Sequence, residues 1–261
     1  DVSIETARPV DYDDLVNIDS RLERCAVNDL QGNVRLIDVA DGREVGGFPC
    51  LGAPASLFSF SLDRRYVMAR FHPGYEPGRG QDANKEAVFL VWDLQEGREA
   101  LRLSVGRPQG AAAFGPDSKL LAVAGNDGQF VLYELPLATQ TRRFSTDPWP
   151  RCAAFAPSGD RIAVSSDKTK VVTIHRVDSG EVVARLQHPD VVSSLAWAPS
   201  GDVVATGCKD QKVYLWDAAS GSLRSLLEGH GDRLLRVVFS HSGDLLVSSS
   251  RDNRTIFWDP N

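Results

Sequence analysis

Hydrophobic and polar residues alternate over short segments along most of this chain, and a polar turn follows each segment. The stretch from Leu195 to Gly221, LAWAPSGDVVATGCKDQKVYLWDAASG, predicts three short strands, each ending in a turn. Its closing Trp216-Asp217 pair recurs 42 positions later as Trp258-Asp259. Backward steps of 41 or 42 positions from Trp216 reach His175, Tyr133 and Trp92. The pattern therefore indicates a repeat of short antiparallel strands.

Six units with this spacing can be recognised. They run approximately over residues 14–42, 57–93, 111–134, 152–176, 195–221 and 236–259. Segments such as EVVARLQH and SLRSLLEGH lie between units and are predicted to form a fourth, outer strand for the preceding unit. The last unit ends directly after its third strand, so its fourth strand must come from elsewhere. Val2 and Ile4 alternate with polar residues before Pro9, which makes the amino-terminal segment the expected donor.

The second unit is longer than the others because of an insertion, HPGYEPGRGQDANKEA, between Phe71 and Val88. The insertion is rich in Gly, Pro and charged residues, and it shows no strand pattern. It is predicted to be a loop.

The period and the Trp-Asp endings resemble those of WD-repeat β-propellers. Two units have a fuller signature with a 28-residue interval from His to Trp. These sets are His188, Thr206, Asp210 and Trp216, and His230, Ser248, Asp252 and Trp258. The resemblance implies that each set forms a hydrogen-bonded chain linking the outer and inner strands of one blade.

The resemblance implies an all-β propeller with six recognisable four-stranded blades, closed by pairing of the amino-terminal strand with the last blade. Closure would remove a free sheet edge. A single domain over residues 1–261 is expected. The alternative is a seventh blade in a longer parent chain, because the sequence begins with Asp1 rather than Met.

Composition narrows the class of protein. Hydrophobic residues make up 42% and charged residues 25% of the chain, as in ordinary folded domains, and the formal net charge is −6. This charge disfavours nucleic acid and anionic membranes as partners. No apolar run reaches the length of a membrane span. The four cysteines, Cys25, Cys50, Cys152 and Cys208, are widely spaced, which favours buried thiols in a reducing compartment, the cytoplasm, over disulfides or zinc ligands.

The recurring Ser/Thr, His and Asp residues could suggest a hydrolase, because a nucleophile needs a base and the base needs an orienting carboxylate. A catalytic set has no reason to recur once per repeat, so a structural role is expected, with no cofactor, metal or enzyme activity. The Asp residues that close the units, Asp38, Asp93, Asp217 and Asp259, are expected to cap turns. The alternative is a six-bladed enzyme with a central-channel site, either a hydrolase or a metal-dependent lactonase, for which only His72 and Glu76 are candidates.

The favoured function is a protein-interaction scaffold or recognition module. With four antiparallel strands per unit, loops entering the first strand and loops joining the second and third strands lie on one side, here called the top face. This face carries nine cations but only three carboxylates, those of Asp127, Asp210 and Asp252. The excess of positive charge predicts an acidic or phosphorylated peptide or protein partner. The predicted partner-binding residues are Tyr75, Arg79, Arg107, Trp149, Arg151, Lys168, Lys170, Lys209, Lys212, Arg233, Arg251 and Arg254.

Overall fold

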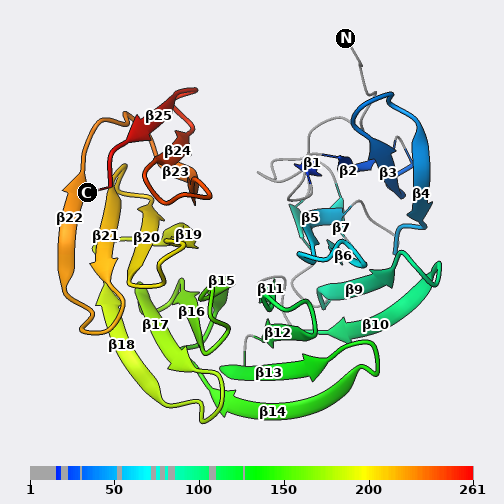
Figure 1. The fold of residues 1–261 in the computed structure, drawn as a ribbon, viewed down its shortest axis with the longest axis horizontal. Helices are drawn as coiled ribbons and strands as arrows, with labels where there is room; N and C mark the ends of the chain where they lie inside the picture. Colours follow the sequence, from blue (N-terminus) through cyan, green and yellow to red (C-terminus); the bar gives the residue numbers. More distant parts are fainter. Residues whose placement is uncertain are drawn as a thin grey trace. The chain divides into compact units, whose positions relative to one another are not determined.

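The computed structural model describes residues 16–18, 23–29, 31–51, 55–71, 75–76, 80–81, 86–105, 110–125 and 127–260. All regular secondary structure in this part of the chain is β-strand, and the strands form successive antiparallel sheets (Figure 1). The all-β prediction is therefore confirmed. The described residues contain no helix of the length and apolarity that a membrane crossing needs.

Five sheets have four strands each. The first contains β1 (Val16–Ile18), β2 (Arg24–Asn28), β3 (Val34–Asp38) and β4 (Glu44–Phe48). The second contains β5 (Ala55–Phe60), β6 (Tyr66–Phe71), β9 (Val88–Asp93) and β10 (Arg98–Ser104). The third contains β11 (Ala111–Phe114), β12 (Leu120–Ala124), β13 (Gln129–Glu134) and β14 (Thr139–Ser145). The fourth contains β15 (Pro150–Phe155), β16 (Arg161–Ser166), β17 (Val171–Arg176) and β18 (Val182–Gln187). The fifth contains β19 (Val192–Trp197), β20 (Val203–Cys208), β21 (Val213–Asp217) and β22 (Leu223–Leu227).

The sixth sheet has three strands in the described part of the chain: β23 (Leu234–Phe239), β24 (Leu246–Ser250) and β25 (Thr255–Trp258). The segment predicted to complete it, around Val2 and Ile4, lies outside the described residues. Pairing of this segment with β25 stays a prediction.

The insertion of the second unit is not all loop. Its β7 (Tyr75–Glu76) and β8 (Gly80–Gln81) pair as a short antiparallel ribbon. The prediction of a strand-free insertion was wrong at these four residues. Each strand is only two residues long, too short for an alternating pattern to be visible in the sequence.

The chain divides into two compact units. One comprises Asp1–Gln109, Asp117–Leu120 and Tyr133–Thr139, and the other comprises Gly110–Pro116, Leu121–Leu132 and Gln140–Asn261. The second, here called unit 2, contains the fourth, fifth and sixth sheets. The expectation of one domain over residues 1–261 stays a prediction.

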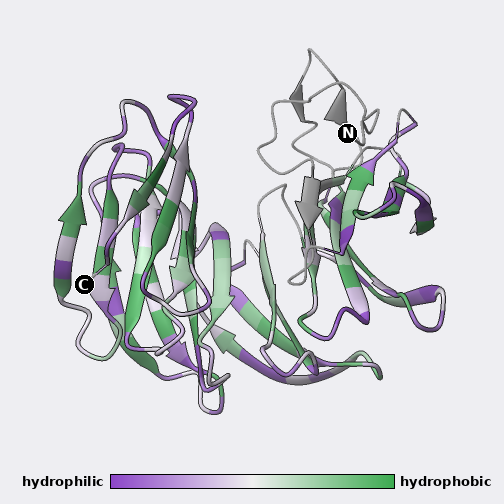
Figure 2. Cartoon of the chain, turned by 45° about the horizontal axis from the view of Figure 1, so that its top comes forward, coloured by the Kyte–Doolittle hydropathy of each residue, from purple (hydrophilic) through white to green (hydrophobic). Residues whose placement is uncertain are grey.

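Burial within unit 2 depends on the position of a strand in its sheet. The middle strands β17 and β20 are buried on both faces because neighbouring sheets pack against them. Accordingly, β20 consists of apolar or small residues, and β17 is apolar or small except for the buried His175 and the exposed Arg176 at its end. The outer strands β14 and β22 are largely exposed. Figure 2 shows hydrophobic residues along the inner strands and hydrophilic ones at the connecting loops.

The core of unit 2 lies between sheets. Val172 and Ile174 of the fourth sheet pack with Trp197 and Val204 of the fifth, and on the other face Leu215 packs with Leu234 of the sixth. Each such fully buried aliphatic side chain contributes about 1.5–3 kcal/mol to folding. This packing holds the loops of adjacent sheets in fixed positions.

Candidate interaction surface

Trp149 lies in the loop between β14 and β15 and is the most unusual residue of the predicted surface. Its φ is +59°, a conformation that bulky side chains rarely adopt. Its side chain nevertheless remains 45% exposed. Two hydrogen bonds fix the loop. The Ser166 hydroxyl donates to the Pro148 carbonyl at 2.6 Å, and the Asp167 N–H donates to the Trp149 carbonyl at 3.0 Å. The fold therefore holds an apolar ring out toward solvent.

One cation lies beside this ring, and a second, Arg151, forms an ion pair in the same region of the chain. The Lys168 ammonium is 5.8 Å from the centroid of the indole, within the range of a cation–π contact. The Arg151 guanidinium pairs with the Asp167 carboxylate at 3.1 Å. The other Asp167 oxygen, Oδ1, is buried and has no hydrogen-bond partner. Sequence reasoning missed Asp167, although its place in the loop joining the second and third strands identifies it as a top-face residue.

Several of the other predicted cations already have partners. Lys170 contacts the Pro189 carbonyl at 3.0 Å and Asp190 at 3.5 Å, and Lys212 pairs with Glu228 at 2.5 Å. Arg254 donates to the Gly229 carbonyl at 3.4 Å. The charges of Lys170 and Lys212 are therefore partly neutralised within the protein, and Arg254 is held by a backbone carbonyl.

The charge count made from the sequence was incomplete. Eight cations lie on the described top-face loops of unit 2 and at the adjoining start of β15: Arg151, Lys168, Lys170, Lys209, Lys212, Arg233, Arg251 and Arg254. Eight carboxylates lie on the same loops: Asp127, Asp147, Asp167, Asp190, Asp210, Glu228, Asp232 and Asp252. The count from the sequence left out five of these carboxylates: Asp147, Asp167, Asp190, Glu228 and Asp232. The surface is mixed in charge rather than basic.

Five candidates cannot be placed as side chains. Arg79, Arg107 and His72 lie outside the described residues, and only the backbone of Tyr75 and Glu76, in β7, is described. The candidate residues of the insertion therefore add no side-chain positions to the described surface.

In the sixth sheet the predicted hydrogen-bonded chain is present. The Ser248 hydroxyl lies 2.7 Å from Nε2 of His230, and the Asp252 carboxylate lies 2.9 Å from its Nδ1. The Trp258 indole N–H donates to the same hydroxyl at 2.8 Å. These distances would suit a nucleophile, a base and an orienting acid, but Ser248 is only 1% exposed. The set links strands, as predicted.

In the fifth sheet the predicted chain is broken at Asp210. The Thr206 hydroxyl lies 2.8 Å from Nε2 of His188 and accepts the Trp216 indole N–H at 3.0 Å. Nδ1 of His188, however, donates to the Leu186 carbonyl at 3.0 Å. Asp210 instead accepts a hydrogen bond from the Tyr214 hydroxyl. The prediction that Asp210 joins His188 was wrong.

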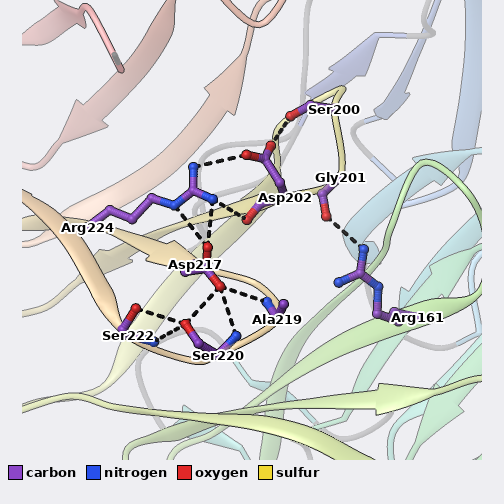
Figure 3. Close-up of polar contacts among 9 residues, drawn as sticks. All are labelled: Arg161, Ser200, Gly201, Asp202, Asp217, Ala219, Ser220, Ser222 and Arg224. Carbon is purple, nitrogen blue, oxygen red and sulfur yellow. Dashed lines mark hydrogen bonds and ion pairs between the residues drawn. The ribbon is translucent and has the colours of Figure 1, made fainter.

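Three of the four aspartates that close the units, Asp38, Asp93 and Asp217, cap turns as expected, while a cap by Asp259 stays a prediction. In Figure 3 the Asp217 carboxylate accepts hydrogen bonds from the backbone of Ala219 and Ser220 and from the Arg224 guanidinium. The Arg224 contact is the main reason that the pKa of Asp217 is held well below its usual range. Asp38 accepts from Ala40 N–H, and Asp93 accepts from Gln95 N–H. These groups stabilise turns.

Groups of three or more His, Cys, Asp or Glu side chains suited to a metal ion do not occur within the described ranges. The four cysteines are free thiols. Burial raises the pKa of Cys208 to about 12, so this thiol stays protonated at neutral pH.

These sheets, with their recurring registers and buried polar chains, define a β-sheet repeat protein. Residues 153–240 match the family model described as the anaphase-promoting complex subunit 4 WD40 domain. A chain in the crystal structure of the mitotic checkpoint complex is similar over 94% of this chain and 73% of its own length, with a TM-score of 0.77 and 16% identity. The family match supports a WD-repeat relationship over residues 153–240, and the structural similarity supports the fold.

Two further results limit what the comparisons say about function. No curated protein matches the chain significantly. In contrast, 1865 chains of solved structures match it, so this fold by itself does not select a partner. Nothing in the comparisons supports the alternative of an enzyme.

Proposed function

We propose that this chain is a non-catalytic protein-interaction module whose partner docks on the top face of unit 2. The WD40 family match and the structural similarity to a chain of a multiprotein complex support an interaction role. The single observation that carries the proposal is the conformation of Trp149. A bulky residue at φ +59° costs free energy, on the order of 1–3 kcal/mol, and here that cost keeps an aromatic ring exposed.

Strained, exposed aromatic residues are typical of binding sites, because an indole buries a large apolar area on docking at little loss of side-chain entropy. Lys168 next to the ring adds a positive charge. Trp149 is therefore the proposed anchor of the interface.

The proposed partner is an acidic or phosphorylated peptide segment. Because the top face is mixed in charge, attraction must come from the cations whose side chains make no polar contact within the described residues: Lys168, Lys209 and Arg233. Carboxylates or a phosphate close to Trp149 would form charge-assisted contacts with Lys168.

The test uses fluorescent peptides of one length in acidic, phosphoserine-containing, neutral and basic versions, with binding measured by anisotropy. We expect the acidic or phosphorylated peptides to bind, and Trp149→Ala and Lys168→Glu each to weaken binding about tenfold or more. Val182→Ala serves as the control, since it truncates another exposed apolar side chain of unit 2. Equal binding of neutral and basic peptides, or no effect of Trp149→Ala, would remove this proposal.

We also propose that the six sheets are six blades of one propeller and that residues 1–9 complete the sixth. The three-stranded sixth sheet supports this, since Phe257 on its last strand is 65% exposed. Deleting residues 1–9 should then lower Tm by several degrees. An unchanged Tm would contradict closure by this segment.

The cytoplasm is the proposed location, and the four free thiols support it. Fractionation of cells producing the tagged protein tests this.

A further inference from the structure

The outer strand of the third sheet, β14, presents an exposed edge. The sheet order is β11-β12-β13-β14, so in the described chain one side of β14 pairs with no strand (Figure 1). Every residue of β14 except Phe144 is exposed. The part from Gln140 to Ser145 belongs to unit 2. Such an edge offers backbone N–H and C=O groups to another extended chain.

Contacts on its inner side hold this strand in place. The Phe144 ring packs on Phe130, with centroids 4.8 Å apart, and on the His175 ring at 5.4 Å. On the opposite face, the Thr141 hydroxyl donates to the Leu132 carbonyl at 3.2 Å. The edge is therefore preformed, which lowers the entropy cost of adding a strand.

Two adjacent arginines occupy the middle of this strand. Because side chains alternate along a strand, Arg142 lies on the face of Phe144 and Arg143 on the face of Thr141. Neither guanidinium has an ion-pair or hydrogen-bond partner in the described part of the protein. The two positive charges thus lie on the two faces of one free edge.

The other outer strands differ in charge. Three of their four arginines have carboxylate partners: Arg102 pairs with Glu99 in β10, Arg185 of β18 with Asp147, and Arg224 of β22 with Asp202 and Asp217. The fourth, Arg98 of β10, is adjacent in sequence to Glu99. β4 carries Glu44, which pairs with Arg35. Among the five outer strands, β14 is alone in having two basic residues and no acidic one. Charged side chains on an edge strand protect it against pairing with another chain. Charges that form ion pairs give the same protection, so protection does not require that both arginines of β14 lack partners.

We propose that β14 binds an extended acidic segment of a protein partner by strand addition, with two consecutive carboxylate side chains opposite Arg142 and Arg143. Consecutive residues of an added strand point to opposite faces, so an adjacent acidic pair reaches both guanidinium groups. The backbone supplies affinity and the two ion pairs supply selectivity. This surface is separate from the top face, and the inference does not depend on the function proposed above.

A synthetic peptide of about six residues, the usual length of a strand, with two central glutamates between Val and Thr residues tests the inference. Its dissociation constant is measured by anisotropy against the full chain. We expect Arg142→Glu/Arg143→Glu to weaken binding about tenfold or more, and replacement of the two glutamates by glutamine to do the same. Both arginines are exposed, and unchanged circular dichroism and Tm verify the fold of the variant.

The matched control is Arg98→Glu/Arg102→Glu, which reverses two exposed charges on another outer strand, β10. This control variant must bind the peptide as the unaltered protein does, and an equal loss in both variants overturns the β14 site. A second peptide, N-methylated at alternate residues, keeps the side chains but cannot pair along an edge. Its failure to bind supports strand addition. Undiminished binding of this peptide, or equal competition by an oligonucleotide, shows a simple electrostatic contact and overturns the inference.

Discussion

The fifth and sixth sheets carry the same polar residues at the same spacing, yet they connect them differently. In the sixth sheet His230 donates to Asp252, whereas in the fifth sheet His188 donates to a backbone carbonyl and Asp210 pairs with Tyr214. The position of Tyr214 is occupied by Ile256 in the sixth sheet, opposite Ser248. The Ile256 side chain has no hydrogen-bond donor, so the Asp252 carboxylate remains available to accept a hydrogen bond from His230. We attribute the different partners of the two aspartates to this one neighbouring side chain.

The electrostatic consequences differ as well. Burial lowers the pKa of His188 to about 4, although its hydrogen bond to the Leu186 carbonyl and the charge of Asp210 act in the opposite direction. Burial works to raise the pKa of Asp252, but hydrogen bonds from Gly231 N–H and His230 outweigh it and lower the value to about 2. The two sheets should thus respond to acid in different pH windows.

The largest predicted effect comes from removing the shared hydroxyl. In Thr206→Val, His188 and Trp216 both lose a partner at a site that is 0% exposed, so we expect a loss of about 4 kcal/mol in the free energy of unfolding. Ser248→Ala should cost about 2 kcal/mol, because Trp258 is only half-buried and water can replace the hydroxyl. Urea unfolding measures both.

The exposed Thr255→Val is the control for these two variants and should change stability by less than about 0.5 kcal/mol. Equal losses in Thr206→Val and Ser248→Ala would show that burial does not distinguish the two sheets.

The second prediction concerns pH. His188 has a folded-state pKa of about 4 against 6.5 for the free side chain, so the unfolded chain takes up a proton first. Stability is therefore lost as pH falls from 6.5 to about 4, by about 3 kcal/mol. The Asp252 contribution is present above pH 3.8 and is lost only as pH falls toward about 2.

Denaturant unfolding at several pH values, with an NMR titration of the His188 ring, measures this difference. His188→Gln should show a shallower decline between pH 6.5 and 4. A His188 titration midpoint near 6.5 would contradict the prediction.

The smallest effect is predicted for Tyr214→Phe, which makes the fifth sheet more like the sixth. Loss of the hydroxyl releases Asp210, at a cost of about 1 kcal/mol. The freed carboxylate can turn toward Nδ1 of His188, and we expect the pKa of His188 to rise in an NMR titration. In Asp210→Asn/Tyr214→Phe the rise should be absent. If both variants titrate alike, Asp210 plays no part in the difference.

Much of the fold could be predicted from the sequence, because the alternation of apolar residues and the turn residues are local signals. They indicated the three strands of each unit, the outer strands such as β18 and β22, and the capping role of Asp217. The paired β7 and β8 were missed, since two-residue strands leave no periodic signal. The candidate surface was predicted less well. Trp149 was identified from its neighbour Arg151, but its strained backbone φ cannot be predicted from the amino-acid sequence.

The sequence by itself determined the period, the all-β class and the positions of the buried polar residues, because these depend on spacing along the chain. Only the tertiary structure decided which carboxylate meets which partner. Asp210 and Asp252 are equivalent in sequence, but hydrogen bonds form between groups brought within about 3 Å of each other. That distance depends on side chains from different strands, such as Tyr214 or Ile256. For the same reason, the ion pairs of Arg151 and Lys212, and the free arginines of β14, became evident only once the sheets were assembled.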